Sequence, residues 1–186
     1  MARGEEKLSW YKLDNAGVLY SALQREEYSA VYRFSALMTQ PVDPDVLQRA
    51  IERTMPRFPS FGVRIKRGFF WYYFEPNKAP GPFLKQDIAN PCQPIRFQED
   101  NGWLVRFYCG RRRISVEVFH ALSAGAGTLT FFRPLLAVYL REMGYQIPDG
   151  PGILDVEAPP TREEREDAYA RYASGKSFRG GWEKTA

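Results

Sequence analysis

The sequence predicts an α/β (α+β) fold: a two-layer sandwich in which helices cover one face of a mostly antiparallel or mixed sheet. Three observations support this prediction. Two segments have the pattern of β-hairpins, two others have the pattern of amphipathic helices, and 44% of the residues are hydrophobic, with 15% aromatic. A chain of 186 residues buries roughly two-thirds of its unfolded surface, which is enough for one substantial domain.

The first helix is expected over residues 44–55. Asp43 is a good N-cap, Pro44 suits the first helical position, and Pro56 stops the pattern. A second helix follows the Ala-Gly-Ala-Gly turn at 124–127 and runs to about residue 143.

Leu129, Phe132, Leu136 and Leu140 would form the apolar stripe of this second helix. Pro134 lies inside it and should kink it or split off its first turn. A short helix over about 15–23 and a polar helix over about 162–173 complete the helical prediction.

The strands are expected at 29–39 and in two hairpins. The first hairpin covers 61–66 and 69–75, with a turn at Arg67-Gly68, and the second covers 103–109 and 112–119, with a turn around Gly110. The Pro- and Asn-rich stretch 76–94 between the hairpins is predicted to be a loop.

The composition excludes several functions. The net charge of +4 is too diffuse for a dedicated nucleic-acid or membrane footprint. The charged N-terminus and the lack of a long apolar window predict a cytoplasmic protein with no membrane span. Cys92 and Cys109 lie far apart without a Cys-x-x-Cys pattern, so we expect no disulfide scaffold and no metal site.

The chain has one histidine, so a general base of the imidazole type must be His120. This residue follows the strand that carries Ile114, Val116 and Val118, and it precedes a small-residue turn and a helix. A strand end of this kind can hold a base at a cleft beside helix N-terminal amides. The alternative is a hydrogen-bonded packing residue, which is the more common role of a lone histidine at such a position.

Residues 114–132 read Ile-Ser-Val-Glu-Val-Phe-His-Ala-Leu-Ser-Ala-Gly-Ala-Gly-Thr-Leu-Thr-Phe-Phe. This segment resembles the His-x-x-x-Asp-Gly motif of the superfamily of condensation domains and chloramphenicol-acetyltransferase-like acyltransferases. Residues 32–74 also resemble its alcohol-acetyltransferase-like branch, with a strand, a helix opened by Pro-Val-Asp-Pro, the run Pro-Arg-Phe-Pro-Ser-Phe, and an aromatic hairpin. The resemblance extends to about residue 173.

The resemblance implies an acyltransferase that moves an acyl group from acyl-CoA or a carrier-protein thioester to an alcohol or amine. His120 matches the family's general base, and Gly125 matches the motif glycine, where a missing side chain lets the backbone turn tightly. The family's loop-bracing aspartate is Ala124 here, which offers no charge. The alternative is therefore a catalytically degenerate binding or assembly module of the same fold.

Family members consist of two similar halves, and this chain resembles the first. We accordingly expect an acyltransferase-like lobe at 1–147, a Pro/Gly-rich connector and polar helix at 148–173, and a disordered tail or linker at 174–186. Such a lobe would be truncated relative to the family, and it would associate with a second lobe or with another copy of itself.

Further candidate residues are Arg111, Arg112 and Arg113, together with Trp71 and Tyr73. The arginines are typical of a solvated hairpin tip, and binding of a CoA phosphate is the alternative. The aromatic residues would line a substrate tunnel or pack in the core. The expected cosubstrate is an acyl thioester, with no covalently bound cofactor.

Overall fold

The computed structural model describes residues 11–12, 29–68 and 72–161. The helices expected over 15–23 and 162–173, and the tail 174–186, lie outside the described residues. Trp71 lies outside them as well.

A four-stranded sheet forms the centre of the described structure, with the strand order β2-β7-β6-β5. Strands β2 (Val31–Leu37), β7 (Arg113–Phe119) and β6 (Val105–Gly110) are antiparallel neighbours. The sheet is mixed because β5 (Leu84–Gln86) runs parallel to β6. Strand β5 lies inside the stretch that we predicted to be loop, and its three residues are too few to show a strand pattern.

The first predicted hairpin belongs to a separate three-stranded sheet, with the order β1-β4-β3. Strands β3 (Val63–Arg67) and β4 (Tyr72–Pro76) pair antiparallel as expected, and the short β1 (Tyr11–Lys12) pairs with β4. Strand β3 is therefore an edge strand of this sheet.

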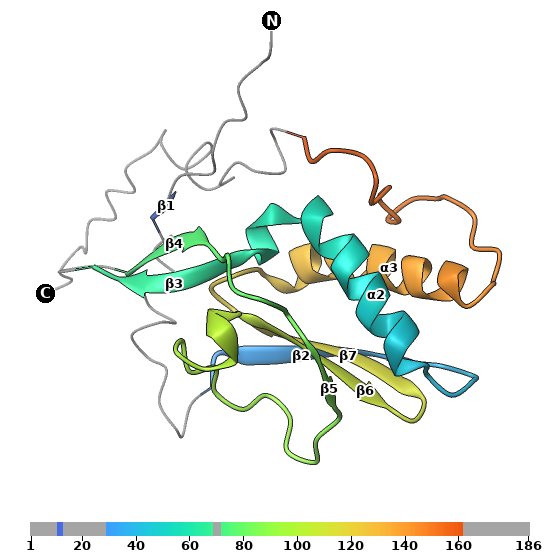
Figure 1. Cartoon of the computed structure of the whole chain (residues 1–186), viewed down its shortest axis with the longest axis horizontal. Coiled ribbons are helices and arrows are strands. Elements are labelled where there is room, and N and C mark those ends of the chain that lie inside the picture. Colours follow the sequence, from blue (N-terminus) through green and yellow to red (C-terminus); the bar gives the residue numbers. More distant parts are fainter. Residues whose placement is uncertain (1–10, 13–28, 69–71, 162–186) are drawn as a thin grey trace, which may run out of the picture.

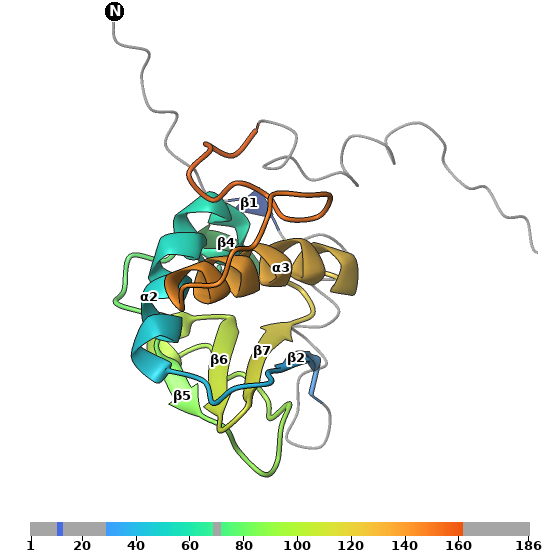
Figure 2. The same ribbon diagram turned by 90° about the vertical axis from the view of Figure 1, so that its right-hand side faces the viewer.

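Helices α2 (Pro44–Thr54) and α3 (Gly125–Glu142) pack on one face of the four-stranded sheet (Figure 1). The turned view in Figure 2 shows them side by side on that face. The Asp43 carboxylate caps α2 by accepting hydrogen bonds from the amides of Asp45 and Val46, as predicted. Three short 3₁₀ helices occupy turns: η1 (Met55–Arg57), η2 (Pro59–Phe61) and η3 (Asp100–Gly102).

The core between helices and sheet is aromatic, as the composition predicts. Phe131 of α3 stacks on Phe61 with ring centroids 4.6 Å apart, and it also contacts Phe58 and Phe107. A second buried cluster, which includes Phe74, Leu104 and Phe119, joins the β3–β4 hairpin to the end of the central sheet. The two-layer α/β fold predicted from the sequence is confirmed.

Two details of α3 differ from the prediction. The helix continues through Pro134 as one element, so its first turn is not split off, and the proline is buried as Phe131 and Leu135 are. The buried face of the helix also differs from the predicted apolar stripe. Val138 and Tyr139, which were not in that stripe, are buried, whereas Leu136 and Leu140 of the stripe are only half-buried. No helix among the described residues has the length and apolar character needed to cross a membrane.

Candidate active site at the end of strand β7

His120 is the first residue after strand β7 and lies at the start of the turn that leads to α3. Its amide donates a hydrogen bond of 2.7 Å to the carbonyl of Ala30, and the amide of Leu122 closes the turn on the Phe119 carbonyl at 2.8 Å. The strand-turn-helix arrangement expected around His120 is therefore present. Strand β7 ends one residue earlier, so strand alternation does not extend to this side chain.

The imidazole of His120 lies against Tyr32, which extends from strand β2. The two ring centroids are 5.2 Å apart at an interplanar angle of 64°, which is an edge-to-face contact. His120 is half-buried, so the ring has a packed side while part of the residue reaches the surface.

The hydroxyl of Tyr32 connects the strand, the turn and the helix. It donates to the carbonyl of Ser123 at 2.8 Å, and it lies 2.6 Å from the hydroxyl of Thr128, which is completely buried in α3. Because the single Tyr32 proton is used on the carbonyl, Thr128 donates and Tyr32 accepts. Burial raises the pKa of the Tyr32 phenol, although both hydrogen bonds act in the opposite direction. The phenol therefore stays neutral and keeps its proton for this bond.

Sequence analysis missed Tyr32 and Thr128. Tyr32 could be identified only from the register of β2 against β7. In that register Tyr32 pairs with Val118, which lies two residues before His120. That pairing joins residues far apart in the chain and is not visible in a local pattern.

Ala124 occupies the N-cap position of α3 and provides no side-chain hydrogen bond to the helix. The neighbouring Ser123 hydroxyl donates to the Ala124 carbonyl at 3.0 Å instead of capping the helix. Without a carboxylate at position 124, the N-terminus of α3 has no side-chain cap. The same turn is held instead by the hydrogen bond from the Tyr32 hydroxyl on β2 to the Ser123 carbonyl.

Gly125 and Gly127 differ in how closely their surroundings approach them. A Cβ added at Gly125 would lie 3.6 Å from the Phe34 ring, an ordinary contact. One added at Gly127 would lie 2.5 Å from the Ser123 hydroxyl, which would have to move. The closer approach is therefore at Gly127, two residues after Gly125.

A cavity of about 230 Å³ adjoins the motif turn. Its walls include Ser123, Gly127 and Thr130 on one side and η2 on the other, with the buried guanidinium of Arg57 among them. His120 is not one of its lining residues.

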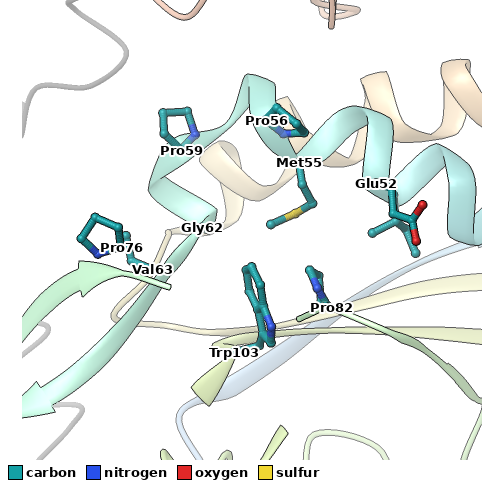
Figure 3. Close-up of a pocket in the computed structure, with 11 residues that line it drawn as sticks. Glu52, Met55, Pro56, Pro59, Gly62, Val63, Pro76, Pro82 and Trp103 are labelled. Atoms are coloured by element: carbon teal, nitrogen blue, oxygen red, sulfur yellow. The ribbon is translucent and has the colours of Figure 1, made fainter. Parts of the chain in front are cut away.

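A second cavity, of about 380 Å³, is almost entirely apolar (Figure 3). Met55 and Trp103 point into it, and Glu52 is the one charged residue on its wall. The Trp103 indole is held by a hydrogen bond of 3.0 Å to the Pro80 carbonyl. Pro59 lies on the walls of both cavities, so η2 separates them.

Among the described residues, the three predicted arginines lie far from His120. Arg111, Arg112 and Arg113 lie at the opposite end of β7, which at about 3.3 Å per residue places them roughly 20 Å away. Tyr73 is half-buried on β4, in the other sheet. The structure therefore does not bring the arginines together with the motif turn.

The two cysteines are free thiols, Cys109 buried on β6 and Cys92 half-buried in a loop. Burial raises the pKa of both. Within residues 29–68 and 72–161, no group of three or more His, Cys, Asp or Glu side chains is arranged to hold a metal ion.

No family model matches the sequence, and no curated protein matches it. Solved structures do match. The starter condensation domain of rhizomide synthetase RzmA has a TM-score of 0.57 at 14% identity over 76% of this chain. The first condensation domain of the calcium-dependent antibiotic synthetase, in complex with a substrate analogue, has a TM-score of 0.52 at 20% identity over 76% of the chain. The X-domain from teicoplanin biosynthesis has a TM-score of 0.57 at 16% identity over 81% of the chain.

The fold is therefore that of a condensation domain, in part. This chain covers 40% of each of the two condensation-domain chains and 36% of the X-domain chain. At these identities the likeness concerns the fold alone.

Proposed function

We propose that the protein is an acyltransferase, or the first half of one, of the alcohol-acetyltransferase-like branch, and that His120 is its general base. The observation that carries the proposal is the place of His120. It lies directly after the central strand of a condensation-domain fold, at the start of a turn fixed by Tyr32 and followed by a long helix. No other histidine is present to take this role.

In the proposed reaction, His120 takes the proton from the hydroxyl or amine of the acceptor. The freed electron pair attacks the carbonyl carbon of the acyl thioester, so that a C–O or C–N bond forms. The C–S bond then breaks, and the thiolate leaves with the proton from the imidazolium. A neutral imidazole suits this task because its ordinary pKa is near neutral pH, whereas that of an alcohol is far higher.

Tyr32 is a positioning residue in this scheme. Its ring packs against the imidazole, and its hydroxyl holds the Ser123 carbonyl. The N-terminus of α3 adds positive partial charge at the far end of the same turn, where it favours a developing oxyanion.

The proposed donor is acyl-CoA or a carrier-protein thioester, with no covalently bound cofactor. Because the chain covers about 40% of the condensation-domain chains, we propose that a second lobe or a second copy of the chain supplies the other wall of the active site.

The test is the variant His120→Ala in the full chain, assayed for transfer from acyl thioesters to alcohol and amine acceptors. Loss of a general base lowers the rate by about 10²- to 10⁴-fold, while circular dichroism shows an unchanged fold. The matched control is Arg112→Ala, an exposed residue at the other end of β7, which keeps the normal rate. Normal turnover by His120→Ala, or no transfer by the unaltered chain together with its second lobe or second copy, would refute the proposal.

A further inference from the structure

A groove of about 600 Å³ lies beside the β3–β4 hairpin and is separate from the cavities described above. One wall is the edge strand β3, and the other is the segment that contains η3. Its lining residues are mainly basic, aromatic and amide-bearing: Arg64, Ile65, Lys66, Arg67, Tyr72, Ala79, Phe97, Gln98, Asn101 and Gly102.

The charge of this groove is positive. Arg64, Lys66 and Arg67 line it, and none of its described lining residues carries a carboxylate. Glu75 is the nearby counter-charge: it is 2.6 Å from the Arg64 guanidinium and 3.9 Å from the Lys66 ammonium. Arg67 is exposed and forms no ion pair in the described part of the chain. Two cations are therefore available to an anionic ligand.

The edge of β3 adds main-chain donors. The Asn77 amide bonds to the Gly62 carbonyl, and alternation along the antiparallel pair then directs Arg64 and Lys66 main-chain groups toward β4. The amides of Ile65 and Arg67 consequently point away from β4, along the outer edge of the strand.

Two half-buried aromatic rings form the apolar part of the groove. Tyr72 and Phe97 meet edge-to-face with centroids 6.4 Å apart, and Phe97 in turn packs on Phe119, 5.5 Å away. Phe119 directly precedes His120, so a continuous set of rings joins the groove to the end of β7. Rings of this kind offer a surface on which a planar group can stack.

The wall opposite β3 is a strained but firmly held turn. Asp100, Asn101 and Gly102 all have left-handed backbones, with φ of 50°, 56° and 78°. The Asp100 carboxylate binds the Lys85 ammonium and accepts from Arg106 Nε at 3.1 Å. Non-glycine residues in this conformation are costly and persist where neighbouring contacts impose them, often at ligand sites.

The side chain of Asn101 adds further support. It donates to the Pro80 carbonyl at 3.0 Å, while the Asn101 carbonyl accepts from Asn77 at 3.0 Å. The groove is thus preformed, which lowers the entropic cost of binding.

We propose that this groove binds a phosphorylated nucleoside, with the base stacked on Tyr72 and Phe97 and the phosphate held by Lys66, Arg67 and the β3 edge. Guanidinium and ammonium groups are the usual protein partners of phosphate. The ligand has two possible sources, a free nucleotide or the nucleotide end of CoA. The second source rests on the proposed function and would make CoA thioesters the donors.

The test is calorimetric titration of the full chain with adenosine 3′,5′-bisphosphate, CoA, adenosine and inorganic phosphate. We expect saturable binding of the bisphosphate, with adenosine and phosphate each much weaker. The double variant Lys66→Ala/Arg67→Ala should weaken bisphosphate binding by about tenfold or more. The matched control Arg111→Ala/Arg112→Ala removes the same charge from exposed arginines on the far turn and should leave the affinity within about twofold.

Phe97→Leu tests the stacking surface. It should weaken bisphosphate binding by about fivefold or more while leaving phosphate binding unchanged. Tighter binding of CoA than of the bisphosphate identifies CoA as the source, and equal or weaker binding identifies the free nucleotide.

The proposal is overturned if the bisphosphate shows no saturable binding, or if the control on the far turn loses as much affinity as the groove variant. Binding by His120→Ala separates this proposal from the proposed function, since that variant should lose transfer and keep the nucleotide.

Discussion

The two ends of strand β7 look equally suggestive in the sequence, but they are built differently. At the C-terminal end, His120 packs on Tyr32, whose hydroxyl ties the turn to α3. At the N-terminal end, Arg111 and Arg112 are exposed, and Arg113 is bound by Asp87 at 2.6 Å. The first end holds the proposed general base against Tyr32, whereas at the second end Arg113 forms an ion pair with Asp87. The dense cluster of arginines is therefore a weaker indication of function than the single histidine, whose position is fixed by its contacts at the end of the strand.

The largest effect on stability is expected at the arginine end. The nearly buried Asp87 accepts from Arg33 at 2.6 Å and from Arg113 at 2.7 Å. Asp87→Asn removes the charge that both guanidiniums face and leaves the buried Arg33 undercompensated, so we expect a loss of about 3 kcal/mol in the free energy of unfolding. Urea unfolding measures it. The control Asp149→Asn breaks an exposed pair with Arg141 and should change stability little.

The same carboxylate predicts an acid dependence. Burial by itself would raise the pKa of Asp87, but the hydrogen bonds and charges of Arg33 and Arg113 outweigh it and lower the pKa. A folded-state pKa below the unfolded value stabilises the protein above the ordinary aspartate pKa of about 3.9. This stability is lost as the pH falls through the lowered folded-state pKa. Asp87→Asn should remove this part of the acid dependence, and an unchanged pH profile of unfolding would contradict the assignment.

The apolar half of the fold could be predicted from the sequence, because its signals are local. Asp43 and the helical spacing that follows it fixed α2, and alternation correctly assigned Ile114, Val116 and Val118 to one face, all of them buried. Strand β5 was missed because three residues are too few to show a period, and because its partners on β6 lie 23 positions away in sequence, as in the pair Leu84 and Phe107.

The polar face of the sheet could not be predicted in the same way. Ser115 and Glu117 alternate with the aliphatic residues, and alternation assigns them to solvent, yet both are completely buried. The loop over residues 87–104 covers them: the amide of Cys92 donates to Glu117 at 2.8 Å, and Arg106 donates to the carbonyl of Gln93. Burial of this face depends on a long-range contact that no local pattern contains.

At the histidine end, loss of the hydrogen bonds of the Tyr32 hydroxyl should have an intermediate effect on stability. Tyr32→Phe keeps the ring contact with His120 but leaves the buried Thr128 hydroxyl and the Ser123 carbonyl without their partner. We expect a loss of about 1–2 kcal/mol in stability and a lower kcat, with KM less affected. Thermal unfolding and transfer kinetics measure the two effects.

Tyr145→Phe is the matched control for this variant, since Tyr145 is 48% exposed and lies beyond the end of α3. It should change neither stability nor rate. Equal behaviour of the two variants would show that the Tyr32 hydroxyl does not hold the turn.

The smallest effect on stability and on rate is expected at Ala124, although this position carries the sequence argument for a catalytically degenerate protein. Ala124→Asp supplies the missing N-cap of α3 and should stabilise the protein by about 0.5–1 kcal/mol. The control Ala126→Asp adds the same charge to the first helical turn at an exposed position without the N-cap geometry, so the difference between the variants isolates the cap.

The rate of acyl transfer should change by less than about threefold in Ala124→Asp, because Tyr32 already fixes the Ser123 carbonyl from the strand side. A marked gain in transfer, absent from Ala126→Asp, would contradict this expectation. It would mean that Tyr32 fixes the turn without holding His120 in a productive position. The chain would then be a weakened catalyst whose rate is limited by the missing carboxylate at position 124.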